Sequence, residues 1–209
     1  MWVDECRHLP LVETGNLKNR LSHSLSPRWA RSSVFPHPAA RQTGPKGFAI
    51  SSLLLREAKP DDAELILALI RELAVFERLE QECVADSGLL RHFLFEDKKA
   101  HAIVAEWEGE PAAFALYFYN FSTFMGRPGL YLEDLFVRPA FRRKGIARAI
   151  FHWLAKKAVA EGCGRFEWSV LDWNENAIAF YRGLGAKPME EWIIQRLTGD
   201  ALKRLADQP

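Results

Sequence analysis

Cysteine is scarce in this sequence of 209 residues, which contains only Cys6, Cys83 and Cys163. An odd number of cysteines without a C-x-x-C spacing favours neither a disulfide framework nor a zinc site. No stretch approaches the ~18–20 consecutive apolar residues of a membrane-spanning helix, and the first thirty residues lack the apolar centre of a secretory signal. We therefore expect a cytoplasmic protein that holds no metal and contacts no membrane.

Acidic residues are absent between Gly15 and Arg56, where Ser, Arg, Pro and His recur without helical or strand periodicity. Residues 1–52 are therefore predicted to form a disordered basic extension. The same composition is typical of organelle transit peptides, so organelle targeting is a second interpretation of this extension. Residues 53–209 are long enough for one domain with its own core.

The domain itself carries slightly more acidic than basic side chains, and the basic extension brings the formal net charge of the whole chain to +1. Proteins that bind nucleic acid usually meet its phosphates with clustered Lys and Arg. A mildly acidic domain suits a cationic small molecule better, and we expect no nucleic-acid partner.

Hydrophobic periodicity divides the domain into alternating strands and helices. Leu65, Ile66, Leu69, Ile70, Leu73 and Phe76 recur at helical spacing and predict an amphipathic helix with one buried stripe. Hairpins come first and a β-α-β-α-β unit follows, which predicts an α/β (α+β) fold. The expected strands are 53–56, 101–107, 112–121, 130–137, 165–170 and 192–197, and the expected helices are 58–76, 87–95, 146–160 and 175–184.

A basic turn joins strand 130–137 to helix 146–160. The unpaired N–H groups at a helix start can hold an anion, and a glycine lets the main chain approach a phosphate closely. The turn lacks the P-loop and the three-glycine dinucleotide fingerprint, which disfavours nucleotide hydrolysis and NAD binding. An ordinary strand-to-helix connection with a solvated basic cluster is the alternative. The residues concerned are Arg142, Arg143, Lys144, Gly145 and Ala147.

Residues 142–147, Arg-Arg-Lys-Gly-Ile-Ala, resemble the R/Q-x-x-G-x-G/A signature of the GNAT acetyltransferase superfamily. Residues 72–77, 132–137 and 173–186 are similar to its spermidine/spermine (diamine) and thialysine acetyltransferase branch. The resemblance covers 53 to about 197. It implies the GNAT acyl-CoA N-acyltransferase fold, a mixed and mostly antiparallel central sheet flanked by helices, in which strands 130–137 and 165–170 splay apart.

The resemblance also implies acetyl-CoA as the co-substrate. Backbone groups of Leu135, Phe136 and Val137 would pair with its pantetheine arm, and one of them could polarise the thioester carbonyl. Asn174 and Ala177 would lie beside the same arm, although Asn174 is also a favoured helix N-cap. The pyrophosphate and its surroundings would be held by Arg142, Arg143, Lys144, Gly145, Ile146, Ala147 and Arg148.

Two residues resemble the acid and the base of this branch. Tyr181 matches the tyrosine that donates a proton to the departing thiolate, and a half-buried core tyrosine is the alternative. Glu133 matches the residue that takes a proton from the amine through water, with Asp134 as second choice. Strand alternation predicts that only one of these two carboxylates faces the cleft. A solvated acidic pair is the alternative for both.

Phe76 and Glu77 match a pair that lines the amine entrance in the diamine branch, so the substrate-binding residues are predicted to be Phe76, Glu77, Glu133 and Asp134. Against this, Phe76 fits the buried stripe of its helix, and Glu77 could be one more surface charge.

The sequence thus predicts an N-acetyltransferase that transfers an acetyl group from acetyl-CoA to a primary amine of a small molecule, directly within a ternary complex. The acceptor would be a polyamine, a diamine or a lysine analogue. The alternatives are a protein or peptide N-acetyltransferase and a non-catalytic acyl-CoA-binding sensor. A homodimer is expected from the resemblance.

Overall fold

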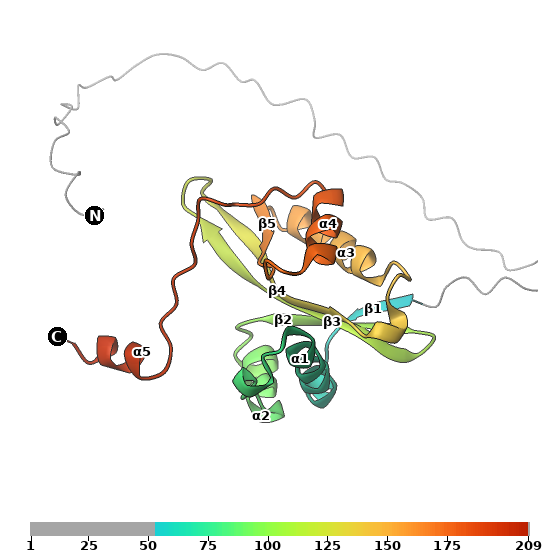
Figure 1. Ribbon diagram of the computed structural model, residues 1–209, viewed down its shortest axis with the longest axis horizontal. Helices are drawn as coiled ribbons and strands as arrows, with labels where there is room; N and C mark the ends of the chain where they lie inside the picture. The colour runs from blue at the N-terminus through green and yellow to red at the C-terminus, as the bar shows by residue number, and fades with distance from the viewer. Residues whose placement is uncertain (1–52, 209) are drawn as a thin grey trace, which may run out of the picture. The chain divides into compact units, whose positions relative to one another are not determined.

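The computed structural model describes residues 53–208 (Figure 1). The predicted disordered extension, 1–52, lies outside the described residues and stays a prediction. The strands are β1 Leu53–Glu57, β2 His101–Trp107, β3 Glu110–Ser122, β4 Arg127–Val137 and β5 Arg165–Trp168. The α-helices are α1 Ala63–Glu77, α2 Ser87–Arg91, α3 Ile146–Ala160, α4 Glu175–Gly183 and α5 Gly199–Ala206.

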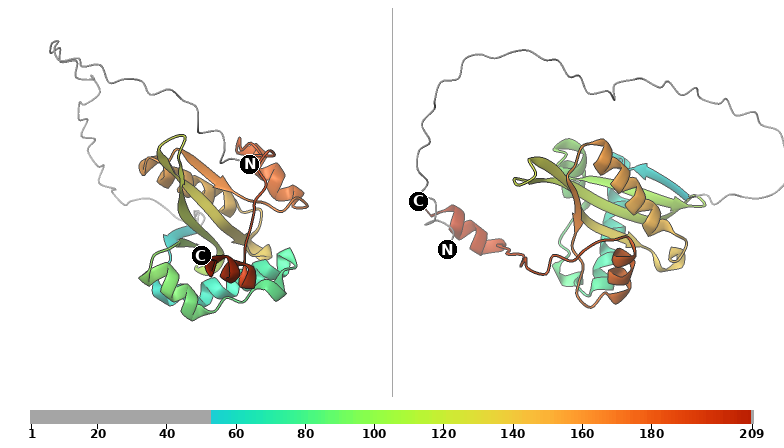
Figure 2. Two further views of the ribbon diagram at one scale, coloured as in Figure 1. Left: turned by 90° about the vertical axis from the view of Figure 1, so that its left-hand side faces the viewer. Right: turned by 90° about the horizontal axis from the view of Figure 1, so that it is seen from above.

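The five strands form one mixed sheet in the order β1-β2-β3-β4-β5. The first four strands pair antiparallel, and β5 pairs parallel with β4. Helices α1 and α2 lie on one face and helices α3 and α4 on the other, as Figures 1 and 2 show from different directions. The predicted fold class and the mostly antiparallel sheet are confirmed.

Each face of the sheet has its own hydrophobic core. Under α3 the core includes Ile150 and Leu154 of that helix and Leu130 and Leu132 of β4. Under α1 it is built from that helix and the middle strands, and it includes Ile66, Leu69, Leu73, Val104, Phe114 and Phe136. The apolar stripe of α1 therefore fixes the helix against β3 and β4, and β4 carries part of the predicted site.

The pairing between β4 and β5 is short. Residues 129–132 of β4 pair with residues 165–168 of β5, and β4 then continues to Val137 with β3 as its single strand partner among the described residues. From Glu133 onward, the β4 backbone edge that faces away from β3 has no strand partner among the described residues. The predicted splaying of these two strands is confirmed.

A β-bulge lies at the point where β4 loses β5. Tyr117 of β3 pairs with Leu132, Leu116 pairs with Asp134, and Glu133 between them has no partner. Leu132 belongs to the core under α3, whereas Leu116, opposite Asp134, packs against the core under α1. The extra residue resets the alternation, so Asp134 lies on the α1 face although Leu132, two residues earlier, lies on the α3 face. The expectation that only one of the two carboxylates faces the cleft stays a prediction, with Asp134 as the one that the pairing places on the α1 face.

Four of the five α-helices were predicted to within about five residues at each end, α5 was not predicted, and the last predicted strand does not form. Trp192, Ile193 and Ile194 have no regular secondary structure, and their side chains are 71%, 81% and 69% exposed. The predicted strand 192–197 is therefore wrong for this structure. A strand needs a neighbouring backbone to complete its hydrogen bonds, and local alternation does not supply one. The predicted helix 87–95 is α2 followed by a π-helical turn, His92–Glu96.

Among residues 53–208, no helix has the length and apolar character needed to cross a membrane. The cytoplasmic location stays a prediction.

Truncating the centre of the α1-side core should destabilise the domain strongly. Phe114 is fully buried and lies opposite Phe136 in the β3–β4 pair. We expect Phe114→Ala to lower the free energy of unfolding by about 3–5 kcal/mol, because it removes buried apolar surface and leaves a cavity. Urea unfolding followed by circular dichroism would measure this. A loss below about 1 kcal/mol would contradict the assigned packing.

Candidate active site

The turn before α3 presents backbone N–H groups that no side chain caps. Gly145 is the N-cap residue of α3, with φ 80°, and it makes no side-chain cap hydrogen bond. Arg143, two residues earlier, also has a positive φ of 61°. Nothing lies within 4 Å of the position that a Cβ of Gly145 would take, so the space in front of the helix start is open. This combination suits an anionic group such as a pyrophosphate.

Basic side chains surround this turn, and all of them are exposed. The Lys144 ammonium lies 4.7 Å from the centre of the Trp107 ring, and the Arg148 guanidinium lies 5.7 Å from that of Phe180. Arg142 turns the other way, donating from Nε to the Val137 carbonyl oxygen at 3.0 Å. Ile146 is buried and anchors the first turn of α3, while Ala147 is partly buried beside it.

The unpaired edge of β4 leads directly into this turn. Leu135, Phe136 and Val137 lie on the part of β4 that has no β5 partner. Their side chains alternate between the two cores, with Phe136 under α1 and the other two against the core under α3. The backbone edge therefore has no strand partner among the described residues, with the Val137 carbonyl oxygen bonded to Arg142 at its end, while the side chains hold the strand in place. An extended polyamide chain could pair with such an edge as an added strand.

Helix α4 closes the other side of the splayed strands. Asn174 caps it, because its side-chain oxygen accepts a hydrogen bond from the Ala177 N–H at 3.2 Å. The capping interpretation of Asn174 is thus confirmed, and its contact with a pantetheine arm stays a prediction. Tyr181 lies on α4 one turn after Ala177. Its ring packs at 5.2 Å from the Trp168 ring of β5 and at 5.4 Å from the Phe151 ring of α3.

Tyr181 is partly buried, and its hydroxyl has no hydrogen-bond partner among the described residues. Burial raises its pKa above the usual value, and the negative charge of Glu77 raises it further. The hydroxyl therefore stays protonated across the neutral range. Because Glu77 belongs to α1, this coupling shows that the end of α1 and helix α4 approach the same region.

Three carboxylates lie close enough to interact beside the bulge. Burial raises the pKa of Asp134 to about 6, and the charges of Glu133 and Glu77 add to the shift. Burial also raises the pKa of Glu77. Glu133 is exposed. Glu77 is the member of this cluster whose charge acts on Tyr181, and the pKa of Asp134, about 6, lies close to neutral pH.

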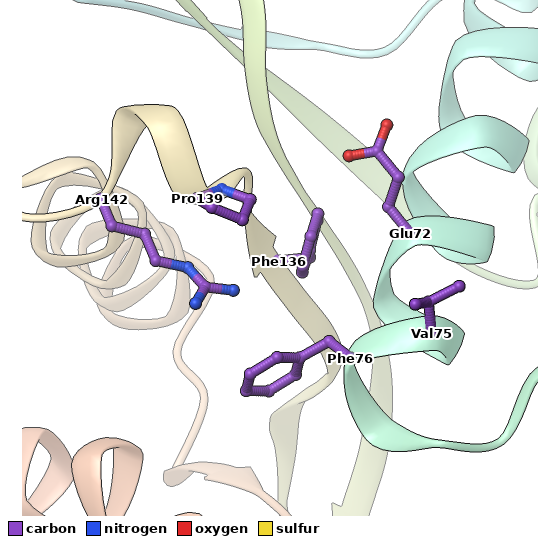
Figure 3. A pocket seen from close by; sticks show the side chains of 6 residues that line it. All are labelled: Glu72, Val75, Phe76, Phe136, Pro139 and Arg142. Carbon is purple, nitrogen blue, oxygen red and sulfur yellow. The ribbon is translucent and has the colours of Figure 1, made fainter.

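A cavity of about 370 Å³ adjoins these groups and is walled by α1, by β4 and by the turn after β4 (Figure 3). Its lining residues are Glu72, Val75, Phe76, Phe136, Pro139 and Arg142. A second hollow of similar size lies against residues 188–191 and contains none of the predicted site residues.

Phe76 is 37% exposed and belongs to neither core, so the buried-stripe interpretation of this residue was wrong. Its ring lies 4.9 Å from the Arg142 guanidinium and 5.9 Å from the Trp173 ring. Phe76 therefore connects the basic turn with the loop that precedes α4, on the α1 side of the splayed strands. This position is consistent with the predicted substrate-binding role.

Sequence reasoning missed the residues that hold these parts together. Arg138 donates to both carboxylate oxygens of Glu72 at 2.6–3.0 Å and to the Pro111 carbonyl oxygen at 2.8 Å. It thus ties α1 to the end of β4 and the start of β3. Glu72 and Arg138 are 66 positions apart, and no local pattern reports such a pair. Trp173 could have been found from its place next to Asn174.

In the part of the chain that the structure describes, no group of three or more His, Cys, Asp or Glu side chains is arranged to hold a metal ion.

Comparison with known proteins gives a consistent result. Residues 67–186 match the model of the Acetyltransferase (GNAT) family. A thialysine N-epsilon-acetyltransferase of Caenorhabditis elegans is 40% identical over 71% of this chain and 94% of its own length. An L-ornithine N5-acetyltransferase of Arabidopsis thaliana is 33% identical over 78% of this chain and 92% of its own length. A solved integron cassette protein from V. cholerae superposes with a TM-score of 0.65 at 25% identity, covering 75% of this chain and 99% of its own.

Because the pKa of Asp134 is raised in the folded protein, the ionised form of this residue should destabilise the fold measurably. A carboxyl whose pKa is higher in the folded state than in the unfolded state favours folding while it is protonated, and this benefit is lost as the pH rises through the folded-state value of about 6. We expect Asp134→Asn to raise the free energy of unfolding by on the order of 2 kcal/mol above pH 7. Most of this gain should disappear by pH 4.

Urea unfolding at pH 4, 6 and 8 would measure the effect. Glu64→Gln, on the exposed face of α1, is the matched control and should change stability by less than about 0.5 kcal/mol at every pH. An Asp134→Asn variant that is no more stable at pH 8 than the parent protein would contradict the burial of this carboxylate.

Proposed function

The chain belongs to the acetyltransferase (GNAT) family, and on this premise we propose that it transfers an acetyl group from acetyl-CoA to a primary amine of a small molecule. The observation that carries the proposal is the continuity of the site. The free edge of β4 begins beside the carboxylates and Tyr181 and ends at the uncapped start of α3. A long donor with an anionic group at one end and a reactive group at the other fits this arrangement.

The residues present fit acetyl-CoA as the donor. Residues 142–148 supply the uncapped N–H groups and the positive charge that a pyrophosphate needs. The backbone edge of Leu135, Phe136 and Val137 would hold the pantetheine arm, with Ala177 on the opposite side. Acetyl-CoA supplies an acetyl group activated as a thioester. A backbone N–H of the free edge, aimed at the carbonyl oxygen, would stabilise the negative charge that develops there.

Tyr181 would act as the general acid. When the amine nitrogen attacks the carbonyl carbon, a C–N bond forms and the C–S bond breaks, so the departing sulfur needs a proton. The raised pKa of Tyr181 keeps its hydroxyl protonated until then.

A carboxylate on the α1 face would act as the general base, because an amine with a pKa near ~10 arrives as an ammonium ion and must lose a proton before it attacks. The bulge places Asp134 on the α1 face, and Glu133 is its neighbour in the chain. A base is most effective when its pKa lies near the working pH, which favours Asp134 with its pKa of about 6. Exposed Glu133 would then pass the proton on to solvent.

The negative charge of Glu77, Glu133 and Asp134 favours a cationic acceptor. Both relatives described above are named for acetylating amines of small molecules, thialysine and L-ornithine, which supports the same acceptor class here. A protein or peptide acceptor and a non-catalytic acyl-CoA sensor remain as outcomes of the test, not as further proposals.

Replacing the proposed acid should slow the chemistry without weakening the donor complex. We expect Tyr181→Phe to lower kcat about a hundredfold, because the thiolate would leave without its proton donor, and to change the KM for acetyl-CoA little. Thiol release from acetyl-CoA would be followed with ornithine, lysine, thialysine, putrescine, spermidine and a Lys-containing peptide.

The control is Tyr119→Phe, which removes a hydroxyl that donates to Glu161 at the C-terminal end of α3, and it should leave kcat within about twofold. Unchanged turnover in Tyr181→Phe would withdraw the acid role. Release with the peptide alone, or tight acetyl-CoA binding without release, would replace the small-molecule proposal by one of the alternatives.

We further propose that the protein acts as a homodimer whose interface includes residues 192–205. Apolar side chains of this segment are exposed in the single chain: Trp192, Ile193, Ile194, Leu197, Leu202 and Leu205. Such a concentration of exposed apolar surface is typical of an interaction site. The β5 edge that faces away from β4 also lacks a partner among the described residues.

Charges introduced into this segment should separate the dimer. We expect the full chain to have twice the monomer mass by light scattering at micromolar concentration, and Ile194→Glu to have the monomer mass, because a buried unpaired carboxylate is costly. Because Ile194 is exposed in the single chain, the circular dichroism spectrum should not change. A monomeric parent protein, or an Ile194→Glu variant that is still dimeric, would contradict the proposal.

A further inference from the structure

The last turn of α1 carries two of the predicted substrate-binding residues, Phe76 and Glu77, but the core does not hold it. The core under α1 includes no residue of this helix after Leu73. Val75 is 60% exposed and Phe76 is 37% exposed. Apolar packing against the sheet therefore fixes the helix only as far as Leu73.

One ion pair ties the helix to the sheet just before this turn. Glu72 accepts hydrogen bonds from Nε and Nη2 of Arg138, at 2.6–3.0 Å. Arg138 is itself held by β3, because its N–H donates to the Ala112 carbonyl oxygen at 2.9 Å and its Nη1 to that of Pro111 at 2.8 Å. Helix residues four apart share one side, so Glu72 lies one turn before Phe76 on the same side of α1 (Figure 3). The pair therefore connects the end of α1 to backbone that is already fixed.

The geometry of this pair suits orientation better than stability. The Arg138 and Glu72 side chains are 28% and 38% exposed. Solvent screens the attraction between such charges, so the pair adds little to the free energy of folding. A two-point contact between a guanidinium and a carboxylate does fix the distance and the angle between them. Among the described residues, no other ion pair or side-chain hydrogen bond joins residues 63–77 to another element.

The position of Glu77 matters because its charge acts on both reacting groups. Burial raises the pKa of Asp134 to about 6, and the charges of Glu133 and Glu77 raise it further. Burial and the charge of Glu77 also raise the pKa of Tyr181. Among the other elements packed there, β3 places the apolar Leu116 opposite Asp134, and β5 and α3 place aromatic rings against Tyr181. Interactions between charges weaken with distance, so both pKa values depend on where the end of α1 lies.

We propose that the Glu72–Arg138 ion pair positions the active site by holding the last turn of α1 beside β4. Through this contact, Glu77 keeps its distance from Asp134 and Tyr181. The inference rests on the proposed function, in which a carboxylate of β4 is the base and a tyrosine of α4 is the acid. Glu72 and Arg138 act through Glu77 and are positioning residues.

Arg138→Lys tests the geometry of the pair without changing its charge, because a lysine ammonium cannot make the two-point contact. We expect it to lower the pKa of Asp134 by about half a pH unit or more, since the end of α1 and Glu77 with it would move away. Carbon-13 NMR titration of the carboxyl groups of the full chain would measure this without turnover. The acid limb of the pH profile of kcat/KM, with an acceptor from the panel above, should move to lower pH by the same amount.

A double variant separates position from charge in a second way. Glu72→Gln combined with Arg138→Gln removes the ion pair and leaves the net charge unchanged, and it should lower the pKa of Asp134 at least as much as Arg138→Lys. Arg71→Gln, on the exposed side of α1, is the control and should leave that pKa within about 0.2 pH unit at physiological salt. The urea midpoint of unfolding should stay within about 0.5 M of the parent value in every variant.

The decisive comparison is made in a Glu77→Gln background. Because the pair acts through Glu77, Arg138→Lys should shift the pKa of Asp134 no further once residue 77 is neutral. A shift of the same size with and without the Glu77 charge would overturn the inference. So would a parental Asp134 pKa in both Arg138→Lys and the double variant, or a raised KM for acetyl-CoA as the single change in Arg138→Lys.

The NMR titration also separates this inference from the proposed function. A Glu77-dependent fall of the Asp134 pKa in Arg138→Lys, in a protein that acetylates none of the acceptors, would overturn the proposed function and leave the positioning role standing.

Discussion

The early end of the pairing between β4 and β5 is the constraint on which the site depends. β5 stops at Trp168, whose ring packs at 4.8 Å from Phe151 and at 5.2 Å from Tyr181. This packing sets helix α4 beside the gap. β4 continues because antiparallel pairing with β3 and burial of Phe136 support it on its other side. One strand is left with a free backbone edge in an otherwise well-packed domain.

The bulge at Glu133 gives this edge its chemistry. A regular strand would have sent one of the two neighbouring carboxylates into the core under α3, where an unpaired charge is very costly. With one extra residue, Asp134 reaches the α1 face, and Leu132 and Phe136 still enter the correct cores. Burial next to other negative charges then raises the pKa of Asp134, which is the usual way a protein brings a carboxylate into the neutral range.

The charged side chains of the cleft differ in whether they have a partner of opposite charge. Arg138 neutralises Glu72 and fixes α1 to β4, whereas Arg142 has only a backbone carbonyl as its partner. Glu77, Glu133 and Asp134 have no basic partner among the described residues. The site therefore has an acidic end at these three carboxylates and a basic end at the turn before α3.

The sequence by itself determined four of the five α-helices, the hairpin, the basic turn and the residue types of the site, because helical spacing, turn residues and the Arg142–Ala147 motif are local features of the chain. It could not determine the bulge at Glu133, the exposure of Phe76 or the Glu72–Arg138 pair. Nor could it show that residues 192–197 lack a strand partner within the chain. Only the tertiary structure decided these points, since each depends on contacts between residues far apart in sequence, and a local pattern carries no information about such contacts.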